Sequence, residues 1–343
     1  MRAFRVDRPG HARLVDVPVP TPGPGEVLVR VEAVGICGSD LELIRGTRDA
    51  AFCRFPVVPG HEWSGIIADS APAAPHLHVG MRVVVEGHHF CGACVPCLAG
   101  RTHLCTRYDE YGFTRDGGYR EFVAARVDLC HPITHVTCEL GALAEPTACA
   151  LHAVERSAVD SSDVVVVIGA GPIGLLAAAC VAARGPSRLV VADVRDATFG
   201  VARSLGASDT VCAPATALAQ AIRERVAGGA DVVIEAAGHP LAQVAAADVL
   251  ARGGRLTILG IAGSDRTTPF NFDPLVFRDA RLEAVFAYPS SVFARAVRLI
   301  DEGFVDPSPL ITHRFGLTEA DRALALLEAR GEPVIKVLLD PRA

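Results

Sequence analysis

Four cysteines stand close together in the first third of the chain. Their spacing is C-x2-C-x2-C-x7-C, at positions Cys91, Cys94, Cys97 and Cys105. Thiolates at such short intervals can converge on one tetrahedral zinc ion. Iron–sulfur clusters are held by similar spacings. Because four sulfur ligands leave no open coordination position, a zinc ion held here is expected to be structural.

A second set of potential ligands is scattered over the chain and consists of Cys37, His61, Glu62 and Glu145. A cysteine, a histidine and a carboxylate can hold zinc through three protein ligands and leave the fourth position to water or a substrate. Each residue alone has a more ordinary explanation, since a single cysteine is usually a small core residue. Their occurrence together with the cysteine cluster favours a catalytic metal site.

A glycine pattern, Gly169, Gly171 and Gly174, follows five consecutive β-branched residues, 164–168. In G-x-G-x-x-G the first glycine permits a tight turn, the second lets backbone approach a pyrophosphate, and the third lets the next helix pack against the strand. A second apolar run ends at Asp193, the spacing expected of a carboxylate that binds a ribose 2′-hydroxyl. The pattern predicts a dinucleotide site. A chain with such a site needs no second electron carrier, which favours zinc over an iron–sulfur cluster at the four cysteines.

The character of the chain changes near position 149. Residues 1–148 hold short alternating segments and a proline-rich stretch, which indicates a mainly β domain. Strands and alanine-rich helices alternate over 149–287, as in a doubly wound parallel sheet. We expect the last part, 288–343, to return to the first domain through a strand at 334–339, so that the parallel-sheet domain is an insertion. Strands of the inserted α/β domain are predicted at 164–168, 189–193, 231–235, 255–260 and 282–286.

Composition excludes several classes of function. The 343-residue chain has a formal net charge of −6 and scattered basic residues, which argues against nucleic-acid binding. The uncharged stretch 164–183 is long enough to span a bilayer, but glycines and a proline interrupt it and no aromatic or basic belt flanks it. No membrane attachment is therefore expected. The first residues lack a signal-peptide core, and 11 cysteines then indicate reduced thiols or metal ligands in the cytoplasm.

The chain resembles the zinc-dependent medium-chain alcohol and polyol dehydrogenases over essentially its whole length. The resemblance implies a GroES-like catalytic domain interrupted by a Rossmann domain. A glutamate at 145, where simple alcohol dehydrogenases have cysteine, points to the sorbitol and threonine dehydrogenase branch. The residues that carry the resemblance are Gly35-Ile-Cys37-Gly-Ser-Asp40, Pro59-Gly-His-Glu62, the four clustered cysteines, Asp116-Gly-Gly118, Glu145-Pro146 and 169–174.

The resemblance also implies ligand roles. Cys37 and His61 would bind the catalytic zinc, and Glu62 or Glu145 would take the third protein position, directly or through water. NAD would be the cofactor, and the expected assembly is a homodimer or homotetramer. Cofactor contacts are implied for Gly169, Gly171, Ile173, Gly174, Asp193, Leu259 and Ile261.

The implied reaction is hydride transfer from a secondary alcohol to NAD+, with zinc as the Lewis acid. Ser39, next to the zinc cysteine, would accept the hydroxyl proton. Many relatives relay that proton through a histidine, but this chain has Glu42 at the equivalent place, so the outward route of the proton stays open.

Two short stretches, 55–65 and 111–117, resemble the cyclitol dehydrogenases of aminoglycoside antibiotic biosynthesis, which oxidise 2-deoxy-scyllo-inosamine. The substrate expected is therefore a polyol or an aminocyclitol. The alternatives are a sorbitol- or L-threonine-type dehydrogenase and a zinc-stabilised structural or binding protein on the same fold. The non-enzymatic alternative is disfavoured because every candidate catalytic ligand is present.

Overall fold

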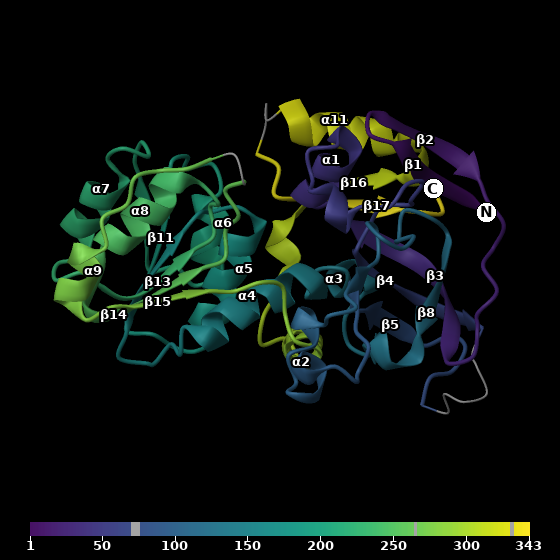
Figure 1. The fold of residues 1–343 in the computed structure, drawn as a ribbon, viewed down its shortest axis with the longest axis horizontal. Helices are drawn as coiled ribbons and strands as arrows, with labels where there is room; N and C mark the ends of the chain where they lie inside the picture. The colour runs from purple at the N-terminus through teal and green to yellow at the C-terminus, as the bar shows by residue number, and fades with distance from the viewer. Residues whose placement is uncertain (70–75, 264–265, 330–332) are drawn as a thin grey trace. The chain divides into compact units, whose positions relative to one another are not determined.

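The protein is represented by a computed structural model that describes residues 1–69, 76–263, 266–329 and 333–343 (Figure 1). Its contacts divide the chain into two compact units. The first unit comprises Met1–Glu145, Tyr288–Phe304 and Ile311–Ala343. The second comprises Pro146–Ala287 and Val305–Leu310. The return of Val305–Leu310 to the second unit is a feature that the sequence analysis does not predict.

The first unit is organised around a mixed sheet in which β3 is the central strand. The order of its described strands is β16-β17-β3-β4-β5-β9, and β8 also pairs with β3. Strand β17 pairs antiparallel with β3 through Leu338 and Gly35, which places the C-terminal strand in the sheet of the first unit. The strands are β1 Arg2–Arg8, β2 His11–Asp16, β3 Glu26–Gly35, β4 Glu62–Asp69, β5 Arg82–Val85, β6 His88–His89, β7 Asp109–Glu110, β8 Phe122–Arg126, β9 Cys130–Pro132, β16 Ile311–Gly316 and β17 Lys336–Asp340.

The helices of the first unit are short apart from two near its C-terminal part. The longest described helix wholly within this unit is α10, which has 12 residues. The helices are α1 Gly38–Arg45, α2 Val95–Leu98, α3 Cys138–Gly141, α10 Ser290–Asp301 and α11 Ala320–Ala329, and α4 Ala144–Arg156 begins in this unit and continues into the second.

The second unit holds a parallel sheet with the described strand order β12-β11-β10-β13-β14-β15. All five predicted strands are present, and β12 is an additional one. Strand β12 has no clear sequence pattern because it is a short edge strand in which Val211 is the one buried residue. The strands are β10 Val164–Ile168, β11 Arg188–Asp193, β12 Asp209–Cys212, β13 Ala230–Glu235, β14 Leu250–Ile258 and β15 Arg281–Ala284.

Helices pack against this sheet and give the second unit its own apolar core. Helix α5 contacts β10 and β11, and α8 contacts β13 and β14, as Figure 1 shows within this unit. The stretch considered as a membrane span is the buried strand β10 followed by the 11-residue helix α5. In the described part of the chain, every helix is too short or too polar to cross a bilayer. The helices are α5 Pro172–Ala182, α6 Phe199–Ser204, α7 Leu218–Arg225, α8 Pro240–Asp248 and α9 Asp273–Arg278.

Candidate active site

Strand pairing in the first unit brings Cys37, His61 and Glu62 together. Gly35, at the end of β3, faces Glu62, the first residue of β4, in the antiparallel register. Cys37 lies two residues beyond β3 and His61 immediately before β4, so both reach the same end of the strand pair. One potential ligand atom from each of the three side chains lies within 4.8 Å of the others. Three converging ligands leave a fourth position open, as in catalytic zinc sites.

The buried carboxylate of Asp40 faces His61. One Asp40 oxygen lies 3.5 Å from Nδ1 of His61, and the other accepts hydrogen bonds from the Cys37 amide at 2.9 Å and the Tyr119 hydroxyl at 3.0 Å. Burial raises the pKa of Asp40, but the charge of His61 and these hydrogen bonds outweigh it and hold that pKa below its usual value. A carboxylate at Nδ1 leaves Nε2 for a metal, which is the usual outer-shell arrangement of zinc-bound histidine.

The only lysine of the chain, Lys336, pairs with Glu62. Its Nζ donates to both carboxylate oxygens of Glu62, at 2.6 and 2.8 Å, and to the carbonyl oxygen of Ile36 at 3.3 Å. Both side chains are buried. The backbone of β3 comes so close that a Cβ on Gly35 would lie 2.2 Å from a Glu62 oxygen. Lys336 is a site residue that no motif predicts, although its being the single lysine among arginines is a signal that could have found it.

Glu145, the rival for the third ligand position, is buried in the first turn of α4. A Cβ on Gly87 would lie 3.1 Å from the carbonyl oxygen of His61 and 3.5 Å from Cγ of Glu145, so both groups adjoin Gly87. Burial raises the pKa of Glu145 to about 7, with Glu62 adding to the rise and His61 opposing it. Among the described residues, the close group of ligand atoms includes Glu62 and not Glu145. The contribution of Glu145 to metal binding stays a prediction.

Ser39 and Glu42 both belong to α1, the helix that begins directly after Cys37. Ser39 is half-buried in the first turn, whereas Glu42 is exposed to solvent. The assignment of Ser39 as proton acceptor stays a prediction. Because Glu42 is exposed, a proton that reached its carboxylate could pass directly to solvent water.

The four clustered cysteines form a second group of ligand atoms within 4.8 Å of one another. The Sγ atoms of Cys94 and Cys97 are 3.4 Å apart, those of Cys94 and Cys105 are 3.9 Å apart, and those of Cys91 and Cys97 are 4.0 Å apart. Four sulfurs bound tetrahedrally at about 2.3 Å from zinc are about 3.8 Å from one another. Backbone hydrogen bonds, that from Ala93 first, lower the pKa of Cys91 to about 5. The geometry of the four sulfurs fits a zinc ion.

The glycine pattern of the second unit lies between β10 and α5. Gly169 has φ +105°, and a Cβ on Gly174 would lie 1.8 Å from the Gly169 carbonyl oxygen, so neither position accepts a side chain. A Cβ on Gly171 would meet open space in front of α5. Backbone N–H groups at such a helix N-terminus can bind a pyrophosphate.

Asp193, the last residue of β11, lies beside this loop. Its carboxylate accepts hydrogen bonds from the amides of Ala170, at 2.7 Å, and Arg195, at 3.0 Å. These bonds hold the carboxylate at the carboxyl ends of the parallel strands, where dinucleotides bind. Of the other predicted cofactor contacts, Ile173 and Leu259 are half-buried and the Ile261 side chain is 82% exposed. An exposed isoleucine at this edge fits a contact with a bound cofactor.

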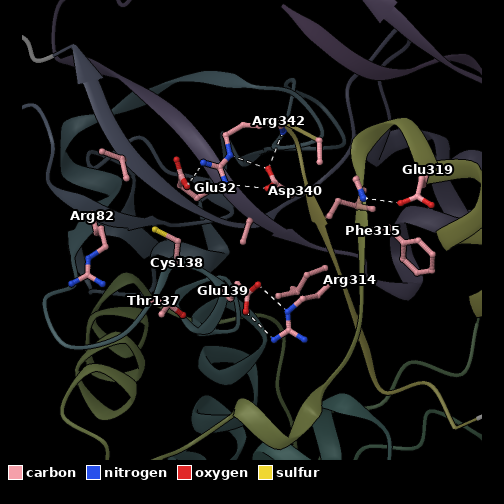
Figure 2. A pocket seen from close by; sticks show the side chains of 16 residues that line it. Glu32, Arg82, Thr137, Cys138, Glu139, Arg314, Phe315, Glu319, Asp340 and Arg342 are labelled. Atoms are coloured by element: carbon pink, nitrogen blue, oxygen red, sulfur yellow. Dashed lines mark hydrogen bonds and ion pairs between the residues drawn. The ribbon is translucent and has the colours of Figure 1, made fainter.

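A separate pocket of about 540 Å³ also lies in the first unit (Figure 2). The described residues that line it include no candidate metal ligand. Most of its charged groups are paired: Arg314 with Glu139 at 2.9 Å, and Arg342 with Asp340 at 3.0 Å and Glu32 at 2.8 Å. Because these side chains bind one another, we interpret the pocket as a structural feature.

Comparisons with known proteins agree with this arrangement. The alcohol dehydrogenase GroES-like domain matches residues 23–135, and the zinc-binding dehydrogenase model matches residues 172–302. The erythritol/L-threitol dehydrogenase of Mycolicibacterium smegmatis is 34% identical over 99% of this chain and 98% of its own. The L-threonine 3-dehydrogenase of Bacillus velezensis is 32% identical over 96% of this chain and 95% of its own.

Solved structures are similar over the same length. The crystal structure of a protein assigned as a zinc-binding dehydrogenase from Sinorhizobium meliloti 1021, bound to NADP, has a TM-score of 0.93 and 32% identity, with 99% of each chain covered. The 2R,3R-butanediol dehydrogenase of Bacillus subtilis has a TM-score of 0.89 and 27% identity, again with 99% of each chain covered. The chain therefore belongs to the zinc-dependent medium-chain alcohol dehydrogenases, with a GroES-like domain and a Rossmann-like zinc-binding dehydrogenase domain.

Proposed function

We propose that this protein oxidises a secondary alcohol group of a polyol or cyclitol and transfers the hydride to NAD+. The observation that carries the proposal is the convergence of Cys37, His61 and Glu62 within 4.8 Å, with Asp40 and Lys336 bound behind them. Relatives named for erythritol, sorbitol, L-idonate and D-altritol support the polyol class.

Different residues of the chain would bind the metal ion and accept the proton of the substrate hydroxyl. A zinc ion at Cys37, His61 and a glutamate would supply Lewis acidity that lowers the pKa of the substrate hydroxyl. Asp40 fixes the ring of His61, and Ser39 would accept the hydroxyl proton. The buried Glu145 would act as a further ligand, directly or through water.

NAD is the cofactor that we propose, because of Asp193. A carboxylate at the ribose can accept hydrogen bonds from both free hydroxyls of NAD. The 2′-phosphate of NADP would place about two negative charges against it, at a cost of about 1 to 4 kcal/mol depending on screening. That cost corresponds to roughly a tenfold to thousandfold preference for NAD.

The finer candidate substrate is the aminocyclitol 2-deoxy-scyllo-inosamine. Its support is the resemblance of residues 55–65 and 111–117 to cyclitol dehydrogenases, since the first stretch contains the candidate ligands His61 and Glu62. An amino alcohol such as L-threonine is the second candidate, supported by two relatives named L-threonine 3-dehydrogenase. Measuring NADH formation with the amino compound and its hydroxyl analogue separates these from a neutral polyol.

A homodimer or homotetramer is the proposed assembly. Val276 and Phe277 on α9, and Leu282 on the last strand of the parallel sheet, are large apolar side chains exposed in the single chain. Light scattering of the purified protein measures the state directly, and a mass equal to one chain would contradict the proposal.

The main test is a panel of polyols, cyclitols, aminocyclitols and threonine with NAD and NADP, in zinc-loaded and zinc-depleted protein. Cys37→Ala and His61→Ala should abolish turnover while the circular dichroism spectrum is retained. Cys212→Ala, at an exposed cysteine of the second unit, is the matched control and should keep activity. Full activity in folded protein without zinc would refute the metal-assisted mechanism.

A further inference from the structure

A buried aromatic ring links the candidate zinc ligand His61 to an arginine on another loop. The ring of Phe113 lies 5.0 Å from the ring of His61, measured between centroids, and is fully buried. The guanidinium carbon of Arg48 lies 3.8 Å from the centroid of the same Phe113 ring. The distance from the guanidinium carbon of Arg48 to the centroid of the His61 ring therefore cannot exceed the sum of these two distances.

Arg48 does not stand alone at this place. Its Nη2 lies 3.1 Å from a carboxylate oxygen of Glu110, and the two side chains are only 21% and 15% exposed. Burial raises the pKa of Glu110, while the charges of His61 and Arg48 oppose the rise, so the carboxylate lies within electrostatic reach of the zinc ligand. A pair of opposite charges thus lies beside the Phe113 ring that contacts His61.

The Arg48 guanidinium has more donors than this pair uses. A guanidinium has five N–H groups, and the bond to Glu110 uses one nitrogen. Nε of Arg48 is shielded from solvent and has no hydrogen-bond partner among the described residues. A substrate acceptor would therefore have to meet the Nη groups, whose donors the single bond to Glu110 does not use up.

We propose that the Arg48–Glu110 pair recognises the substrate hydroxyl groups that neighbour the reacting carbinol, and so selects a polyol over a monohydric alcohol. This inference rests on the proposed polyol oxidation. Each hydroxyl both accepts and donates a hydrogen bond, and the pair offers a donor and an acceptor side by side. Because the pair is neutral as a whole, it suits uncharged hydroxyl groups.

The test compares erythritol with 2-butanol, a secondary alcohol that has no second hydroxyl. Arg48→Met should lower the ratio of kcat/KM for erythritol over that for 2-butanol by about tenfold or more, mostly through KM. Glu110→Gln should lower the ratio in the same direction, and Arg48→Lys serves if the methionine variant does not fold. The control is Arg342→Met, which removes an ion pair in the separate pocket of the same unit, whose described lining residues include no candidate metal ligand. This variant should leave the ratio within about twofold.

If Arg48→Met lowers kcat/KM by the same factor for both alcohols, the inference is overturned and the pair has only a structural role. An equal fall of the ratio in Arg342→Met would overturn it as well. If the wild-type enzyme oxidises none of the alcohols in the panel, the proposed function fails. Erythritol binding, measured without turnover, then tests this inference separately. In that case erythritol should raise the melting temperature of the NADH-loaded wild-type protein and not of Arg48→Met, and an identical response of the two would overturn the inference.

Discussion

The buried pair of Lys336 and Glu62 allows a quantitative test of how the site is held together. The two side chains are 3% and 2% exposed, and Nζ contacts both carboxylate oxygens. Lys336→Met keeps the length of the side chain but leaves the carboxylate buried without its partner. Removing one member of a buried pair costs about 3 to 5 kcal/mol, because the remaining charge is not compensated. We expect a loss of this size in the free energy of unfolding of the metal-depleted protein.

A metal ion should reduce that loss. In zinc-loaded protein the released Glu62 carboxylate can face the ion instead, so Lys336→Met should cost less than it does with chelator present. The same substitution in a Glu62→Gln background should also cost less, because the buried group is then neutral. Urea unfolding of the wild type, the two single variants and the double variant, with and without zinc, gives the coupling energy between Lys336 and Glu62.

The control for this cycle is the exposed pair of Arg45 and Glu328, whose atoms lie 2.7 Å apart with side chains 51% and 46% exposed. Arg45→Met should cost at most about 1 kcal/mol, as exposed ion pairs do. If Lys336→Met costs no more than Arg45→Met, or costs the same with glutamine at position 62, the Lys336–Glu62 pair does not stabilise the site.

Three further outcomes are expected. Cys94→Ser should lower both zinc content and melting temperature, since a structural zinc contributes folding energy; unchanged zinc by elemental analysis would exclude the four-cysteine site. Asp193→Ala should weaken NAD binding and improve NADP use, and a wild-type kcat/KM equal for both cofactors would show that Asp193 is not at the ribose. Burial raises the pKa of Glu235 to about 7 from 4.5, although the hydrogen bonds from Gly238 and Ala237 oppose the rise. Between pH 4.5 and pH 7, Glu235 is therefore protonated in the folded state and ionised in the unfolded state. Stability should therefore fall by roughly 2 to 3 kcal/mol as pH rises from about 4.5 through 7, and Glu235→Gln, compared in urea unfolding, should remove this slope; an identical slope in the variant would contradict the assignment.

Local patterns predict much of the fold and part of the site. The run of β-branched residues at 164–168 is a strand because parallel strands are buried on both faces. The cysteine spacing indicates a metal site without knowledge of the fold, since its members are close in sequence. The pairing of Lys336 with Glu62 spans 274 positions, and no periodicity reports such a distance. The contact between Arg48 and Glu110 has no local signal for the same reason, because it joins the segment after α1 to strand β7 only in the folded unit.

The single lysine has a practical consequence for chemical modification. Amine-directed reagents react with lysine side chains that reach solvent, and in the folded state Lys336 is 3% exposed and bound to Glu62. Its acylation, read as a mass shift of the peptide that contains it, would therefore measure how often the ligand group opens to solvent. The rate of that labelling, compared with and without zinc, would report the local opening of the site from a residue that the protein already carries.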